Sequence, residues 1–338
     1  MPIAIDSVWV LIGLGLLFLA FGGNFLVRAS VDIAARLGVS PLLIGLTLVG
    51  FGTSTPELVT SIQAALVHAP GIAIGNIVGS NISNILLIIG LSALLTPIAA
   101  RAGAVFRDGA FVVITAVLLA WVSLTDGLSA GTGVLFLALL VIYVLIAWAS
   151  ERAQSTTVQV AIAHSRSGLA LSLVIAAASI AILILGASFL VEGSVRLARS
   201  NGFSEEFVGL TIVAIGTSLP ELFTSVTAAF KRQSDIALGN VLGSSIYNIL
   251  GIGGATALIH PVAVPAQIAN FDNLIMIGAS VLILLWCLLA RGIGRLGGLV
   301  FLALYGGYIY VIHPSQAVLL QDLTKALAPL VQALARVT

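Results

Sequence analysis

Ten apolar segments follow one another along this chain, and they limit its fold more than any other feature of the sequence. Most are about 20 residues long, enough for a helix to cross the hydrocarbon core of a bilayer. Only 8% of the residues are charged, against about 25% in soluble domains. The sequence therefore predicts an all-α polytopic membrane protein with about ten transmembrane helices. The expected spans lie near residues 7–27, 40–66, 71–96, 105–124 and 129–149, and then near 169–195, 206–230, 235–259, 269–290 and 295–313.

A polar stretch at 151–167 divides the chain almost in half. We expect residues 1–150 and 168–313 to form two five-helix repeats joined by this linker, which we place in the cytoplasm. In the remaining tail, 314–338, leucines recur at helical spacing with polar residues between them. This pattern predicts an amphipathic helix that lies on the membrane or packs on the bundle.

The two halves share sequence at a constant shift of 164 residues. Residues 45–66 match 209–230 at 14 of 22 positions, and residues 72–90 match 236–254 at 12 of 19. Such internal similarity predicts two copies of one fold. Because each copy has five spans, the second copy enters the membrane from the opposite side, which makes the repeats inverted.

The distribution of basic residues agrees with inverted repeats and sets the expected orientation. Ten of the fourteen Lys and Arg residues follow odd-numbered spans. The positive-inside rule then places these loops in the cytoplasm and both termini outside. We expect a multi-pass protein of the cell (inner) membrane. Two halves of opposite orientation around a shared site are typical of alternating-access transporters.

One hexapeptide occurs in both halves, as Gly52-Thr-Ser-Thr-Pro-Glu57 and as Gly216-Thr-Ser-Leu-Pro-Glu221. A carboxylate inside an apolar span is costly unless it faces protein, water or an ion. The proline breaks the helix beside it and leaves backbone carbonyls without helical partners. We therefore expect broken helices that bring Glu57 and Glu221 together at a midplane site.

Further oxygen-bearing side chains accompany each glutamate. They are Thr53, Ser54, Ser80 and Asn84 in the first half, and Thr217, Ser218, Ser244 and Asn248 in the second. Carboxylate, hydroxyl, amide and carbonyl oxygens select hard cations such as Ca²⁺, Na⁺ or Mg²⁺. Two ionised glutamates balance the charge of one divalent ion.

Other polar residues of the spans have simpler interpretations. Thr60, Ser61, Thr224 and Ser225 are expected to bond to helix carbonyls. Asn76, Asn81 and Asn240 either bridge helices or belong to the site, and the sequence leaves both open. The four histidines, His68, His164, His260 and His313, lie near span ends, where we interpret them as interfacial residues.

The duplicated pair of motifs, Gly-Thr-Ser-x-Pro-Glu and Gly-Asn-x-x-Gly-Ser-x-Ile-x-Asn, resembles the two alpha-repeats of the calcium/cation antiporter superfamily. Among its members, the chain is most similar to the prokaryotic sodium/calcium exchangers. The motifs cover about 45–90 and 209–254, and the layout of spans extends the resemblance to nearly the whole chain.

The resemblance implies a secondary antiporter that exchanges Na⁺ for Ca²⁺ by alternating access. Three Na⁺ per Ca²⁺, the ratio implied by the resemblance, would make the exchange electrogenic. The implied Ca²⁺ ligands are Glu57, Glu221 and the carbonyls of Thr53 and Thr217. The implied Na⁺ ligands are Ser54, Ser218, Ser80, Ser244 and the carbonyls of Gly50 and Ala214. Asn84 and Asn248 would lie at the centre; several relatives have aspartate at the position of Asn248, which weakens a potassium-dependent interpretation.

We expect Na⁺, Ca²⁺ and membrane lipid as partners, competition by H⁺, no cofactor and a monomeric protein. A net charge of +1 without a basic stripe argues against nucleic-acid binding. No nucleophile–base pair suggests an enzyme. Two alternatives stay open, an H⁺/Ca²⁺ exchanger of the same superfamily and a cation channel. Inverted five-span repeats favour alternating access over a channel.

Overall fold

The computed structural model describes residues 7–36, 50–100, 102–125, 127–152, 168–230, 232 and 234–335. Its elements are helices apart from two short strands, as the lack of water in a bilayer requires. In the first half they are α1 (Val8–Arg36), α3 (Gly50–Thr53), α4 (Thr55–Leu66), α5 (Pro70–Ile82), η2 (Ser83–Ile89), α6 (Gly90–Leu95), β1 (Ile98–Ala99), α7 (Ala102–Ser123) and α8 (Ala130–Arg152).

The second half has a similar order of helices, but its strand lies one span later than in the first half. It contains α9 (Leu169–Asn201), α10 (Glu205–Val208), η3 (Gly209–Val213), α11 (Ala214–Thr217), α12 (Leu219–Phe230), α13 (Ser234–Tyr247), η4 (Asn248–Gly253), α14 (Gly254–Ile259), η5 (Ile268–Asp272), α15 (Asn273–Ala290), β2 (Gly292–Ile293) and α16 (Arg295–Ile312). The 3₁₀ turn η6 (Pro314–Gln316) and α17 (Ala317–Ala335) follow. Four of the segments, η2 to η5, are π-helical.

The all-α, multi-span architecture predicted from the sequence is confirmed. Within the described residues, eight helices are long and apolar enough to cross a membrane, and the bent run from α10 to α12 makes a ninth. One of the eight is the tail, Pro314–Ala335, which is almost entirely unburied. The first part of the span expected near 40–66 lies outside the described residues, which do not include 37–49. Most of the linker expected at 151–167 lies outside them as well.

Contacts between loops show that the two halves are inverted. Strand β1, after the third span, pairs antiparallel with β2, after the ninth, with Ile98 opposite Ile293. Leu128, after the fourth span, forms a bridge with Val262, after the eighth. The ninth span separates the loop after the eighth span from the loop after the ninth. The loop after the third span, which pairs with the latter, therefore lies opposite the loop after the eighth span, its counterpart in the second repeat. Parallel repeats would place these two counterparts on the same side. We refer to the side with β1 and β2 as the odd-loop face, and to the side with Leu128 and Val262 as the even-loop face.

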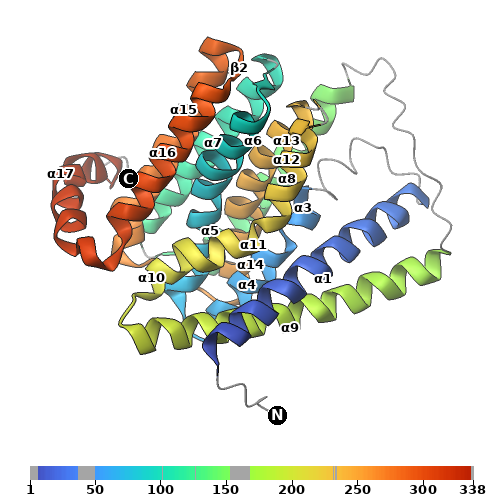
Figure 1. Cartoon of the computed structure of the whole chain (residues 1–338), viewed down its shortest axis with the longest axis horizontal. Helices are drawn as coiled ribbons and strands as arrows, with labels where there is room; N and C mark the ends of the chain where they lie inside the picture. The colour runs from blue at the N-terminus through green and yellow to red at the C-terminus, as the bar shows by residue number, and fades with distance from the viewer. Residues whose placement is uncertain are drawn as a thin grey trace.

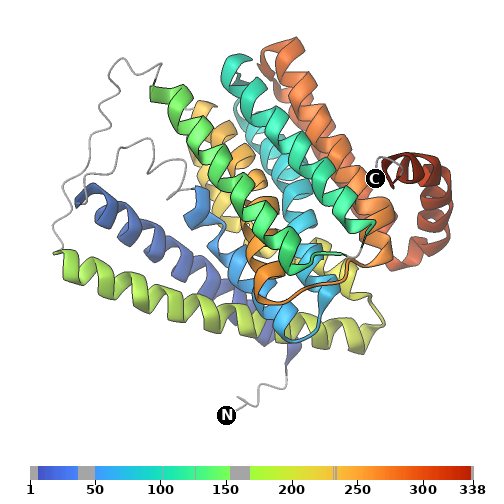
Figure 2. The ribbon, with the colours of Figure 1, turned by 180° about the vertical axis from the view of Figure 1, so that it is seen from behind.

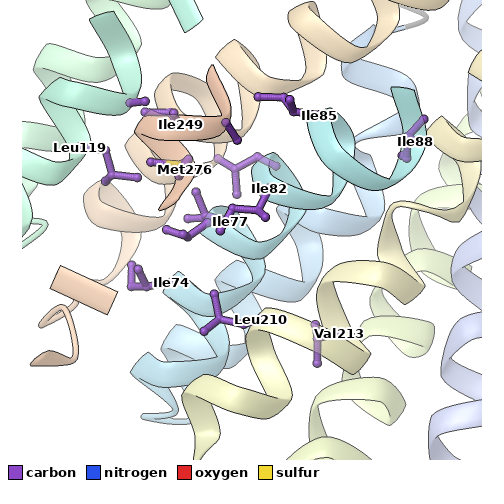
Figure 3. Packing of buried hydrophobic residues seen from close by; sticks show 14 of the residues in the cluster. Ile74, Ile77, Ile82, Ile85, Ile88, Leu119, Leu210, Val213, Ile249 and Met276 are labelled. Carbon is purple, nitrogen blue, oxygen red and sulfur yellow. The ribbon is translucent and has the colours of Figure 1, made fainter. Parts of the chain in front are cut away.

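The third and eighth spans form the centre of the molecule. The most apolar 18-residue stretch is 83% buried in Pro70–Leu95 and 72% buried in Ala237–Ile259, more than in any other unbent span of the described residues. Figure 3 shows isoleucines of α5 and η2 packed against Leu210 and Val213 of η3, Ile249 of η4 and Met276 of α15. Apolar side chains on the outer spans, such as Val141 and Leu145 of α8, are exposed. A buried centre and an apolar exterior are what a lipid-facing bundle requires.

Helices α1 and α9 pack along each other at one edge of the bundle, in both views of the ribbon (Figures 1 and 2). Their close approach depends on small residues. A Cβ at Gly15 would lie 2.6 Å from the backbone nitrogen of Leu190, and one at Gly186 would lie 2.8 Å from the Cβ of Phe18. This pair of long helices crosses the remaining spans at a steep angle (Figure 1).

The tail helix α17 lies at the opposite side of the bundle from α1 and α9 (Figure 1). It has no fully buried residue, but Leu320, Leu323 and Leu327 pack against the core. Its neighbours are α16 and η5. Three leucines of the predicted amphipathic pattern therefore contact the bundle, whereas Leu319 and Leu330 of the same pattern are exposed.

The packing of α5 on η3 gives a testable expectation. A Cβ at Gly79 would lie 2.7 Å from the carbonyl oxygen of Leu210, so Gly79→Ala forces two backbones apart. We expect a loss of about 1–3 kcal/mol in the free energy of unfolding, measured as a lower thermal unfolding temperature of the purified protein in detergent. Gly306→Ala is the matched control, since nothing lies within 4 Å of its Cβ. Equal stability of the two variants would contradict the close approach.

Candidate cation site

Each copy of the Thr-Ser-x-Pro-Glu motif interrupts a helix at its serine, as the sequence predicted. Ser54 separates α3 from α4 with φ −86° and ψ 10°, and Ser218 separates α11 from α12 with φ −81° and ψ 8°. In the second half the two helical pieces are bent by 46°. Proline at the second position of α4 is compatible with a helix start, because its missing N–H would have no helical partner there. Each break therefore starts a new helix with a glutamate in its first turn.

The two helix starts are linked by reciprocal hydrogen bonds. Ser54 Oγ donates to Glu221 Oε1 at 2.7 Å, and Ser218 Oγ donates to Glu57 Oε1 at 2.9 Å. Each glutamate is thus held by the serine of the opposite half. Both glutamate side chains are 1% exposed. The residues that the sequence singled out in separate halves therefore meet in one buried site.

Two asparagines brace the broken helices from behind. Asn76 Nδ2 donates to the Glu57 carbonyl at 3.2 Å and to Ser61 Oγ at 2.9 Å. Asn240 Nδ2 makes the equivalent bonds, to the Glu221 carbonyl at 3.5 Å and to Ser225 Oγ at 3.0 Å. Both residues therefore bridge helices, which is one of the two roles that the sequence left open.

Asn76 also connects the two halves, because its Oδ1 accepts a bond from Thr217 Oγ1 at 3.0 Å. Asn81 differs from the other two asparagines: its amide donates back to the Ile77 carbonyl within its own helix. Thr217 lies beside Glu57, and Thr53 lies beside Glu221. Both threonines are buried.

Several buried polar atoms at this level have no hydrogen-bond partner among the described residues. They are Oε2 of Glu57 and Glu221, both amide atoms of Asn84 and Asn248, and Oγ of Ser244. Buried polar groups without partners are rare in proteins and cost about 1–3 kcal/mol each. These residues were among the candidate ligands of the sequence; buried atoms of other residues, such as Thr60 Oγ1 and Asn240 Oδ1, also lack a partner among the described residues. Buried oxygen atoms without hydrogen-bond partners are expected in a cation site, because the ion would be their partner.

The remaining candidates are also placed near the breaks. Ser80 is fully buried on α5, with its Oγ 3.5 Å from Asn76 Oδ1. Gly50 begins α3, and Ala214 begins α11. The Ala214 carbonyl accepts bonds from Ser218 N–H at 3.2 Å and from Thr217 Oγ1 at 3.4 Å, so a cation that binds this oxygen would replace the longer bond.

No basic side chain compensates the two glutamates within the described residues, whose ion pairs are Arg107–Asp108 and Arg196–Glu192. Removing a carboxylate from water costs several kcal/mol even after relaxation. Two such groups in one site create a strong demand for positive charge. The helix N-termini beside them supply only a partial positive charge.

Sequence reasoning missed a second pair of membrane carboxylates. Asp108 and Asp272 are also one repeat shift apart, so the test that singled out the glutamates would have found them. Tyr143 donates to Asp108 at 3.2 Å, and Tyr308 donates to Asp272 at 3.0 Å. Arg107 also bonds Asp108, and Gln267 also bonds Asp272. Protein partners thus satisfy these aspartates, in contrast to the glutamates.

The π-helical segments were not predicted either. Asn84 lies in the first turn of η2 and Asn248 begins η4. π-Helical turns inside α-helices occur frequently at functional sites. A stack of Phe51 on Tyr247, with ring centroids 4.2 Å apart, was also unforeseen.

A comparison with known protein families shows which family the chain resembles over most of its length. The sequence profile of the family described as "Sodium/calcium exchanger protein" matches residues 7–149 and 171–313, one match in each repeat. The chain belongs to the sodium/calcium exchanger family. This family member is therefore a membrane transporter that exchanges Ca²⁺ and another cation across a membrane.

Individual relatives agree with the family assignment. Sodium/calcium exchanger MaX1 of Methanosarcina acetivorans is 33% identical over 337 residues, covering 88% of this chain and 96% of the relative. Inner membrane protein YrbG of Escherichia coli is 33% identical over 307 residues, covering 87% and 92%. A solved structure of the sodium-calcium exchanger NCX_Mj, soaked with Na⁺ and Ca²⁺, has a TM-score of 0.64 and 33% identity, and covers 90% of this chain and 98% of that one.

The reciprocal serine bonds can be tested without any transport measurement. Ser54→Ala and Ser218→Ala each remove the donor to a buried glutamate, and a hydrogen bond to a charged group contributes about 1.5–3 kcal/mol. We expect both variants to lower the thermal unfolding temperature by similar amounts in the same buffer. Ser280→Ala is the control, because this buried serine bonds only to the Met276 carbonyl of its own helix. A large effect in one variant and none in the other would show that the two bonds are not equivalent.

Proposed function

We propose that the protein exchanges Na⁺ for Ca²⁺ by alternating access at the site between the two broken helices. The observation that carries this proposal is the set of buried, unpartnered oxygens contributed by both halves around two uncompensated carboxylates. Oxygen ligands of this kind suit Ca²⁺ and Na⁺. The relative MaX1 and the structural neighbour NCX_Mj are both named sodium/calcium exchangers.

Glu57 and Glu221 are the proposed shared ligands of both cations. With both ionised, one Ca²⁺ leaves the site neutral, whereas three Na⁺ leave it with one positive charge. Exchange at that ratio is electrogenic. Asn84 and Asn248 contribute neutral oxygens beside the glutamates, so the glutamates carry all the formal charge of the site. Protons compete by neutralising the same two carboxylates.

The other candidates divide between the two cations. We propose that the carbonyls of Thr53 and Thr217 complete the Ca²⁺ site. The proposed Na⁺ ligands are Ser54, Ser218, Ser80, Ser244 and the carbonyls of Gly50 and Ala214. Ser54 and Ser218 already bond to the glutamates. A Na⁺ ion that binds these serines therefore also alters the glutamate oxygens that Ca²⁺ would use. Overlapping sites of this kind make the two cations exclude one another, which is what antiport requires.

Alternating access is proposed to come from the α1–α9 pair. These helices pack on each other and border both broken helices. A Cβ at Gly216, inside the second motif, would overlap Cδ2 of Leu16 on α1. A shift of α1 and α9 relative to the central spans would therefore open or close the approach to the glutamates. Inverted halves make the two access states structurally similar.

We propose that the odd-loop face is cytoplasmic and that both termini lie outside the cell membrane. Arg291 and Arg295 lie beside β2 on this face, in agreement with the positive-inside rule. The relative YrbG is named an inner membrane protein. We propose a monomer as the transporting unit, because both halves of the site come from one chain.

The coupling ion can be determined by ⁴⁵Ca²⁺ uptake into proteoliposomes. We expect uptake under an outward Na⁺ gradient at constant pH and no uptake under an H⁺ or K⁺ gradient without Na⁺. If three Na⁺ exchange for one Ca²⁺, an imposed membrane potential should change the initial rate in the direction of net charge movement. Uptake that follows the pH gradient and ignores Na⁺ would identify an H⁺/Ca²⁺ exchanger instead, and flux without any counter-ion would indicate a channel.

The shared site is tested by Glu57→Gln and Glu221→Gln. Each variant keeps the shape of the side chain but removes half of the formal charge, so we expect exchange to fall to the level of empty liposomes. Glu192→Gln is the control, because this exposed glutamate pairs with Arg196 on α9. Exchange retained in either site variant, with correct folding shown by gel filtration, would contradict the model of one site shared by both cations.

A further inference from the structure

Two histidines, one from each half, meet on the even-loop face. His68 follows α4, and His260 follows α14. Their ring centroids are 5.1 Å apart, with an angle of 71° between the ring planes. The bridge between Leu128 and Val262 holds the second loop in place beside this pair. The interfacial role expected for single histidines at span ends does not explain why two of them converge.

The pair lines a cavity of about 230 Å³ that is open to the outside of the molecule. Its lining consists of Ala65, His68, Pro70, His260, Pro261, Val262 and Ala263. Apart from the two imidazoles, these side chains are apolar and carry no competing charge. The cavity is large enough for an ion with bound water, since a water molecule needs about 30 Å³.

The hydrogen bonding of His260 leaves one ring nitrogen available. Its Nδ1 lies 3.0 Å from the Pro261 carbonyl oxygen. A carbonyl only accepts hydrogen bonds, so this nitrogen carries the proton and Nε2 of the neutral ring has a free lone pair. A bond from the second ring nitrogen to a carbonyl is also the usual arrangement for a metal-binding histidine.

The spacing of the rings suits a single metal ion. For metal–nitrogen distances of about 2.0–2.1 Å, each ring centroid would lie about 3.2 Å from the ion, and a tetrahedral angle would place the centroids about 5.2 Å apart. The observed separation is 5.1 Å. The His68 side chain is exposed, and its χ2 angle is soft, as it is for histidines in general, so the ring can turn with little movement of its centroid.

The repeat supplies an internal comparison. One repeat shift from His68 is Arg232, and both residues have a positive φ, 57° and 56°. The residue one shift before His260 is Thr96. The helix-ending backbone conformation is therefore common to both faces and does not require histidine, while the pair of imidazoles is confined to the even-loop face.

We propose that His68 and His260 form a binding site for a transition-metal ion such as Zn²⁺ or Cu²⁺, with water completing the coordination. Imidazole nitrogens favour these ions over Ca²⁺ and Na⁺. The site is separate from the buried oxygen ligands of the exchange site. Because it joins a loop of the first half to a loop of the second, a bound ion links the two halves on one face only.

The test uses the full-length protein in detergent, without a histidine tag, and Cu²⁺ and Zn²⁺ as probes. We expect one Cu²⁺ to bind with the electron paramagnetic resonance signature of two imidazole nitrogens. His68→Asn retains a residue that tolerates positive φ, and His260→Asn removes the other ligand. Each should weaken Zn²⁺ binding, measured by isothermal titration calorimetry, by about tenfold or more, because loss of even an outer-shell partner costs about 10–100-fold.

His313→Asn is the control, since this ring accepts a bond from Ser315 N–H and contacts Phe207 edge-on, and it is not part of the cavity lining. It should bind Cu²⁺ and Zn²⁺ like the unchanged protein. The double variant Glu57→Gln, Glu221→Gln should also keep the two-imidazole signal, which separates this site from the exchange site. Unchanged Zn²⁺ affinity in His68→Asn or His260→Asn, or a Cu²⁺ signal with one imidazole or none, would overturn the proposal.

Discussion

The burial of two carboxylates in one membrane-embedded site is the constraint on which the rest of the structure depends. Within the described residues no basic side chain approaches Glu57 or Glu221, and each receives a hydrogen bond from the serine of the other half. A protein keeps such uncompensated charge only if something else supplies the opposite sign. The broken helices, the bracing asparagines and the tightly packed central spans all hold these two groups in register.

The comparison with the aspartate pair shows why burial by itself does not define a cation site. Asp108 and Asp272 are duplicated and lie within apolar spans, like the glutamates. Their oxygens, however, accept bonds from tyrosine and from Arg107 or Gln267. These carboxylates tie neighbouring spans together, whereas the glutamates, with Asn84 and Asn248, retain unused oxygens. Unused bonding capacity, and not the mere presence of acidic residues, distinguishes the two sets.

Much of this architecture follows from the sequence, because lipid leaves the backbone few choices. Apolar length predicts the spans, an odd number of spans per repeat predicts inversion, and proline beside glutamate predicts the breaks. The π-helical segments and the convergence of His68 with His260 have no comparable local signal. They arise from packing between distant parts of the chain, as with Asn76, whose bond to Thr217 joins the halves. The sequence shows which polar residues lie in spans, but it does not show which of them find hydrogen-bond partners in the folded protein.

The exchange of donors between the halves has a consequence for how such a chain can change over evolutionary time. Since Ser54 serves Glu221 and Ser218 serves Glu57, neither copy of the motif is complete by itself. A duplicated gene is usually free to lose one copy of a feature, but here drift in either copy deprives the other of its partner. The two hexapeptides are thus constrained together, while positions outside these reciprocal bonds, such as His68 and its repeat counterpart Arg232, are free to diverge. The even-loop face has His68 where the odd-loop face has Arg232. This difference between the two faces is a product of that freedom.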